Sequence, residues 1–274
     1  MGRSALPVHH GLRHWGLVAL LLVPIGGCDS QPPPSDPPHV VDYTLTWQTE
    51  NVTRGADTLE VVTDLGYTVV VERAYLVTFS VQLVPCEDET EITLTRVMGW
   101  LLGGIAHAGH GGENRDPSAA LLPRVETLLE PVTVHHARRP LTDERYCRIH
   151  YLVGPAGPDS VASPADFQLE GTSLYLEGRW YEDDPGAAVP FEVTSRKAYG
   201  ALTHLYPEGR FEDEDARLVW AAGEMGGEVI VERHLGTLFH KINWPTISAV
   251  DLEAQLLRNL IGDTRIRVIL DARN

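Results

Sequence analysis

The sequence predicts a mainly β protein: an antiparallel β-sandwich with one short helix near 92–104 and a C-terminal helix near 248–261. Three observations lead to this fold class. Apolar and polar residues alternate with period two from Tyr67 to Val84, many short strand-like runs follow along the chain, and Gly, Pro and Asp separate these runs. A series of half-buried strands of this kind is typical of two packed antiparallel sheets.

The run from Tyr67 to Val84 is the strongest strand signal. Period two over this length indicates one long, half-buried strand or two strands joined at a bend, because Arg73 interrupts the apolar side. The other predicted strands cover Val40–Gln48, Leu59–Thr63, Val132–His136, Tyr146–Val153, Ser173–Tyr181, Val189–Ser195, Glu228–Arg233 and Arg265–Leu270.

Two stretches depart from the strand pattern. The segment from Ile92 to Ile105 predicts a short helix that ends at two glycines. The second helix is clearer, because Ser248 and Asp251 resemble a capping box, leucines from position 252 to 260 lie along one face, and Gly262 follows as a stop. Such a helix covers a core and need not bind anything.

The first 27 residues have the layout of a signal peptide. Arg3 and Arg13 precede an uncharged run from His14 to Gly27 that ends in small residues. This apolar run is shorter than the roughly 20 residues that a membrane-spanning helix needs. We therefore expect export from the cytoplasm.

The sequence Ile25-Gly26-Gly27-Cys28 resembles the lipobox of bacterial lipoproteins, in which acyl chains such as palmitate are attached through the cysteine. The alternative is an ordinary signal peptide with a chance cysteine. The Pro-rich residues 28–39 predict an extended tether, and 40–274 a single β-sandwich domain. The expected location is the cell envelope, either periplasmic or surface-exposed, with the lipid anchor in the membrane.

Apart from Cys28 the chain has two cysteines, Cys86 and Cys147. In an oxidising compartment they predict one disulfide, which by chain entropy would stabilise the fold by roughly 4 kcal/mol. Two free buried cysteines are the alternative.

The formal net charge of −16 makes binding to nucleic acid unlikely, because such a field repels phosphate backbones. The acidic clusters are explained by solvated loops, and no Asp-x-Asp-x-Asp-Gly calcium loop is present. The sequence also lacks the Gly-x-Ser-x-Gly, His-Glu-x-x-His, phosphate-loop and dinucleotide motifs. We therefore expect a protein that is not an enzyme and has no organic cofactor.

A histidine pair marks the candidate metal site. His107 and His110 stand three residues apart in a Gly-rich segment, and glycine lets the backbone fold back so that two imidazoles can meet one ion. A third ligand would be His135, His136 or His150. Adjacent His135 and His136 point to opposite faces of a strand, so at most one of them can join a given site. Imidazole and carboxylate are the ligands left in an oxidising compartment without spare thiols, and these suit copper or zinc. A polar surface loop without metal is the alternative.

Several segments resemble one known periplasmic group. These are Tyr75–Val77, Glu144–Pro155, Gly171–Gly178, Leu235–Phe239 and Ala254–Leu260, and they are similar to the methanobactin-associated MbnP-like proteins. In that family a β-sandwich carries copper and is paired with a di-haem enzyme. The resemblance implies the same fold, copper rather than zinc, and an envelope partner such as a di-haem enzyme.

Two functions follow from these observations. The first is a membrane-anchored lipoprotein that binds a transition metal, most simply copper, for sequestration or relay. The second is a non-catalytic lipoprotein that interacts with another envelope component and binds no metal.

Overall fold

The computed structural model describes residues 39–86, 117–142, 145–207, 217–221 and 225–271. Their strands form two sheets that share one hydrophobic core, which confirms the predicted mainly β, sandwich-like fold class. The predicted short helix near 92–104 lies outside the described residues, as do Cys28 and the Pro-rich tether up to position 38.

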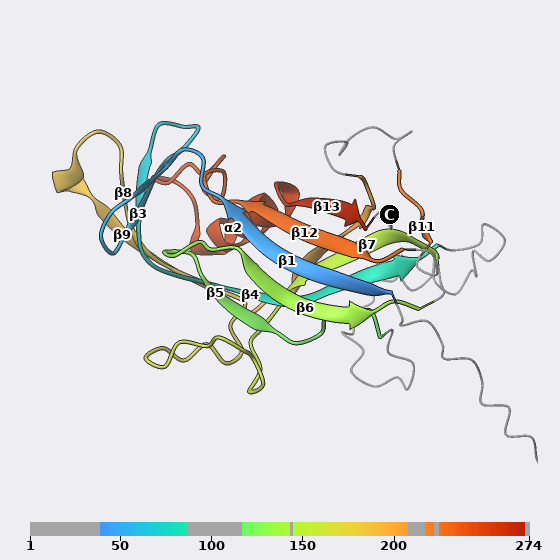
Figure 1. The fold of residues 1–274 in the computed structure, drawn as a ribbon. Helices are drawn as coiled ribbons and strands as arrows, with labels where there is room; N and C mark the ends of the chain where they lie inside the picture. Colours follow the sequence, from blue (N-terminus) through green and yellow to red (C-terminus); the bar gives the residue numbers. More distant parts are fainter. Residues whose placement is uncertain (1–38, 87–116, 143–144, 208–216, 222–224, 272–274) are drawn as a thin grey trace, which may run out of the picture. The chain divides into compact units, whose positions relative to one another are not determined.

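The smaller sheet has the strand order β13-β12-β1-β6 (Figure 1). Its members are β13 (Arg265–Leu270), β12 (Gly227–His234), β1 (Val40–Gln48) and β6 (Val134–Pro140). The β1–β12 pair is parallel and the other two pairs are antiparallel. This sheet therefore joins the first strand of the described chain to its last two, with β12 between β1 and β13.

Strand β4 (Thr68–Pro85) runs through the larger sheet, and its 18 residues contact a different partner at each end. Tyr75 pairs with Thr127 of β5 (Arg124–Thr127) on one side and with Tyr175 of β8 (Leu174–Tyr181) on the other. Strand β3 (Leu59–Val62) pairs with β4 on the same side as β5. Strand β7 (Arg145–Val153) pairs with β4 on the same side as β8.

A β-bulge explains the interruption of the alternation at Arg73. The β4–β8 register shifts between Val71 and Arg73, and both Glu72 and Arg73 are exposed. The segment is therefore one strand whose alternation restarts at the bulge. Gly178 faces this point, where an added Cβ would lie 2.1 Å from the carbonyl oxygen of Val70, so a side chain cannot be placed there without moving the backbone.

Four short strands were not predicted. They are β2, β5, β10 and β11. The remaining elements are β2 (Val52–Arg54), η1 (Pro185–Ala187), β9 (Val189–Ser195), β10 (Tyr199–His204), β11 (Trp220–Ala221) and α2 (Ala249–Gly262).

Helix α2 confirms the predicted C-terminal helix and its start. The Ser248 hydroxyl accepts a hydrogen bond from the Asp251 backbone N–H at 3.2 Å. The buried leucines of the helix join the core, and the helix contacts β9 and β10 of the larger sheet and β12 of the smaller one. No helix within the described ranges is long and apolar enough to span a bilayer.

Cys86 and Cys147 form a disulfide, with 4.9 Å between their Cα atoms. Cys86 directly follows β4 and Cys147 lies in β7, and these two strands are neighbours in the larger sheet. The pairing predicted from the cysteine count is thus the one that the sheet register allows.

Candidate functional site

A fully buried ion pair connects the two sheets. Arg233 of β12 and Glu126 of β5 form two parallel hydrogen bonds of 2.6 Å each, and the side chains are 0% and 6% exposed. This bidentate geometry is the strongest form of a guanidinium–carboxylate contact. The pair therefore fixes the position of β5 against the opposite sheet.

Three further side chains surround the pair. The Thr78 hydroxyl donates to Glu126 at 2.8 Å, and the Trp47 indole N–H donates to the same carboxylate at 3.3 Å. The Arg233 guanidinium lies over the Trp47 ring, 4.3 Å from its centroid. Buried Tyr151 lies 3.4 Å from the Thr78 hydroxyl oxygen. Because both charges are hydrogen-bonded on several sides, the network is fixed in one arrangement.

The electrostatics of the network follow from its burial. Burial raises the pKa of Glu126, but the charge and hydrogen bonds of Arg233 outweigh burial and hold that pKa below its usual value. Burial raises the pKa of Tyr151. Glu126 is therefore ionised and Tyr151 neutral at pH 7.

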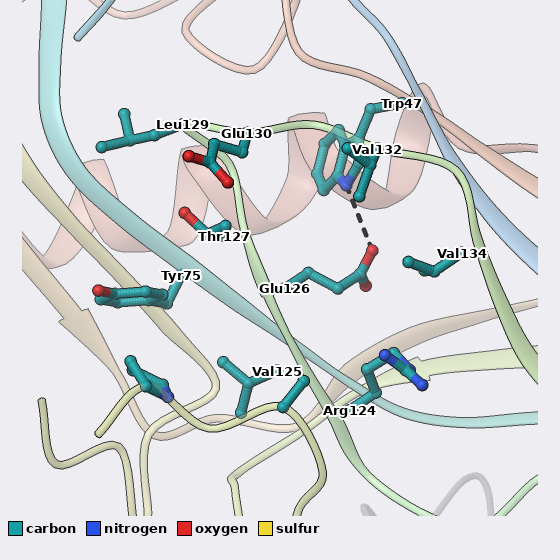
Figure 2. A pocket seen from close by; sticks show the side chains of 12 residues that line it. Trp47, Tyr75, Arg124, Val125, Glu126, Thr127, Leu129, Glu130, Val132 and Val134 are labelled. Atoms are coloured by element: carbon teal, nitrogen blue, oxygen red, sulfur yellow. Dashed lines mark hydrogen bonds between the residues drawn. The ribbon is translucent and has the colours of Figure 1, made fainter. Parts of the chain in front are cut away.

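A cavity of about 410 Å³ lies beside β5, next to this network. Figure 2 shows Glu126, Arg124 and Val134 on one side of β5, and Tyr75 and Val125 on the other. The residues that line the cavity are mostly apolar: Trp47, Tyr75, Arg124, Val125, Glu126, Thr127, Leu129, Glu130, Val132, Val134, Ala162 and Pro164. Its volume and its apolar lining with few polar groups are typical of a small-molecule site.

The loop that closes one wall of the cavity is tied to β5. The Val125 N–H donates to the Val161 carbonyl, and the Val161 N–H donates to the Pro123 carbonyl, both at 2.9 Å. The next residue, Ala162, lines the cavity with φ at +61°, a left-handed conformation that is unfavourable for alanine. Strained backbone of this kind persists only where the surroundings hold it.

A cluster of nitrogen-bearing side chains includes Arg124, which lines the cavity. In the described part of the chain, Nε of Arg124, Nε of Arg139 and both ring nitrogens of His136 are buried without a hydrogen-bond partner. Burial lowers the pKa of His136 to about 4, and the charges of Arg124, Arg233 and Arg139 act in the same direction. His136 is therefore neutral at pH 7.

A second β-bulge places this cluster. Tyr43 of β1 lies opposite Ala137, and Thr44 lies opposite His135, so His136 is the extra residue of β6. His136 and Arg139 would otherwise point to opposite faces of the strand, and the extra residue lets both point inward.

The structure does not bring the three described candidate metal ligands together. His135 is exposed, and its Nε2 lies 2.9 Å from an oxygen of Asp42, to which Arg138 also points. His136 faces inward, as expected for adjacent residues of a strand. His150 lies in β7 of the larger sheet, and burial lowers its pKa.

His107 and His110 lie outside the described residues, so the predicted histidine site stays a prediction. Within the described ranges, no three or more His, Cys, Asp or Glu side chains are grouped to hold a metal ion.

The residues of the buried network were not found from the sequence. The sequence could have indicated Arg233, because it alternates in step with Val229 and Val231 of the predicted strand. Residues two apart face the same side, so the arginine belongs on the inner face. Glu126 had none, since β5 is only four residues long and its neighbour in space is more than 100 residues away.

Comparisons with known proteins add no identification. No protein-family model matches the chain, and neither a curated protein nor a solved structure does. The resemblance to the MbnP-like group thus stays a prediction from the sequence segments.

Proposed function

We propose that this chain is a lipid-anchored, extracytoplasmic binding protein that holds a small, largely apolar molecule in the cavity beside β5. The observation that carries the proposal is the cavity of about 410 Å³, whose lining includes Trp47 and Glu126 of the buried network. A preorganised site loses little conformational entropy when a ligand binds, which favours binding.

The cellular location that the sequence predicts supports the proposal. The signal peptide and lipobox predict a protein anchored at Cys28, and the Cys86–Cys147 disulfide is of the kind that oxidising compartments favour. A tethered domain with an apolar cavity is suited to capture or hand over molecules near a membrane.

Native mass spectrometry on the protein released from its own envelope tests the proposal. We expect a bound small molecule on the wild type, and its loss in Leu129→Trp, where a larger ring fills the cavity. Leu122→Trp is the matched control, because Leu122 is 43% exposed and does not line the cavity. An adduct that survives Leu129→Trp, or no adduct on the wild type, would overturn the proposal.

The same preparation tests the anchor. The N-terminal peptide should begin at an acylated Cys28, and Cys28→Ser should release the protein from the membrane fraction. An unmodified chain that still begins at Met1 would contradict export.

A further inference from the structure

Cationic groups outnumber anionic ones around His136, next to the cavity-lining Arg124, in the described part of the chain. Arg124, Arg139 and Arg233 lie close enough to His136 to act on its charge, and among the residues that the structure describes Glu126 is the one carboxylate that does so. Glu126 is already neutralised by Arg233. Among the described residues, no carboxylate forms an ion pair with Arg124 or Arg139, although the protein has a formal net charge of −16.

Arg124, Arg139 and His136 also carry buried nitrogen atoms without a hydrogen-bond partner within the described residues. A buried donor without a partner costs about 1–3 kcal/mol, so native proteins seldom leave several together unless a water or an ion completes them. Here the Nε atoms of Arg124 and Arg139 and the ring nitrogens of neutral His136 are all in this state.

The apolar part of the cavity lies beside this cluster. Arg124 and Val134 both line the cavity, and Val134 is two residues before His136 in β6. Val132 is 58% exposed, and Glu130 is also exposed, so these two residues mark the outer rim. A carboxylate at the rim disfavours a bound anion there and leaves the inner end as the favourable position for it.

We propose that the ligand is a small organic carboxylate, with its anionic group at Arg124, Arg139 and His136 and its apolar body against Leu129, Val132 and Val134. This proposal rests on the proposed function and names the chemical class of the ligand. The two guanidinium groups match a carboxylate in charge and geometry, and a neutral imidazole adds one N–H donor.

Calorimetry on the full chain in lipid nanodiscs, with empty nanodiscs subtracted, tests the ligand class. The probes are phenylacetate and its neutral counterpart 2-phenylethanol. We expect phenylacetate to bind about tenfold more tightly, the factor of roughly one charge-assisted hydrogen bond. Arg124→Met and Arg139→Met should each remove about tenfold of phenylacetate affinity and leave 2-phenylethanol unchanged.

Arg138→Met is the matched control for these variants. Arg138 precedes Arg139 in the same strand, but its side chain is 66% exposed and faces Asp42 on the outside. It should leave the binding of both probes unchanged. A circular dichroism melt shows that each variant is folded.

The outcomes separate the two proposals. If both probes bind equally and neither Arg124→Met nor Arg139→Met matters, the carboxylate inference is wrong and the apolar cavity stands. If neither probe binds and Leu129→Trp behaves as the wild type, the cavity proposal itself is wrong.

Discussion

At the residue scale, the buried Arg233–Glu126 pair differs in kind from the exposed pairs of the same protein. Both of its charges are removed from water and their hydrogen bonds are provided by protein groups. The exposed Arg73–Glu177 pair keeps 45% and 42% of its side-chain area in solvent. Loss of one partner should therefore be costly only in the buried pair.

Glu126→Gln should lower the free energy of unfolding by about 3–5 kcal/mol, because it leaves the Arg233 charge buried and uncompensated. Glu177→Gln, at the exposed pair, should change it by less than about 1 kcal/mol. Urea unfolding followed by tryptophan fluorescence measures both. Equal effects of the two variants would show that the buried pair is not held as described.

His136 makes stability depend on pH in a defined window. Its pKa of about 4 lies below the ordinary value of about 6.5, so the unfolded chain binds a proton that the folded chain does not. The free energy of unfolding is therefore highest above about pH 6.5, where His136 is neutral in both states. It falls as the pH drops towards 4, because the unfolded chain takes up the proton first.

The pKa difference of His136 should lower the free energy of unfolding by up to about 3 kcal/mol as the pH falls to 4. Unfolding curves between pH 7 and 4 for the wild type and His136→Gln measure it. The variant should have the flatter profile, and His135→Gln, a change of the exposed neighbour, should follow the wild type. Parallel profiles for wild type and His136→Gln would contradict the assignment.

The histidine pair His107 and His110 remains our prediction for copper. Calorimetric titration with Cu(II) and Zn(II) should show binding that His107→Ala/His110→Ala abolishes, and affinity should fall below about pH 6 as imidazoles become protonated. His240→Ala is the control. Unchanged Cu(II) binding in the double variant would remove the predicted site.

At the scale of elements, the two β-bulges and one helix cap decide how side chains are presented. The bulge in β4 turns Glu72 and Arg73 to solvent, and the bulge in β6 turns His136 inward. Neither bulge follows from the apolar pattern alone, because the pattern of one strand does not show where its partner keeps or shifts register.

The cap of α2 can be tested by itself. Ser248→Ala should lower the free energy of unfolding by about 1 kcal/mol, because the Asp251 N–H loses its acceptor. Ser248→Asp restores an acceptor and should recover most of that loss. Thermal unfolding compares the three proteins. If alanine and aspartate behave alike, the cap contributes nothing measurable.

At the scale of the whole molecule, the disulfide closes a long segment of chain. Cys86 and Cys147 are 61 positions apart, and the entropy model gives about 4 kcal/mol for a loop of this length. Cys86→Ser/Cys147→Ser should therefore unfold at clearly lower urea concentration than the oxidised wild type. Reduced wild type should match the double variant, and unchanged stability in both would argue against the pairing.

The elements that could be predicted from the sequence are those that interactions between residues close in the chain define. Strands such as β1 and β9 were predicted with their observed bounds, since alternation and turn residues are local signals. The start of α2 was also local, because Ser248 and Asp251 are neighbours on one turn. The short strands β5 and β10 were not predicted, since their pairing with long neighbours defines them.

The sequence by itself determined the β class, the C-terminal helix and the cysteine pair, because periodicity, capping residues and residue counts require no knowledge of distant neighbours. Only the tertiary structure decided that Arg233 meets Glu126 and that His136 lies near Arg124, which lines the cavity. The physical reason is that these contacts join strands far apart in the chain, and their geometry depends on sheet register and bulges that no local pattern encodes.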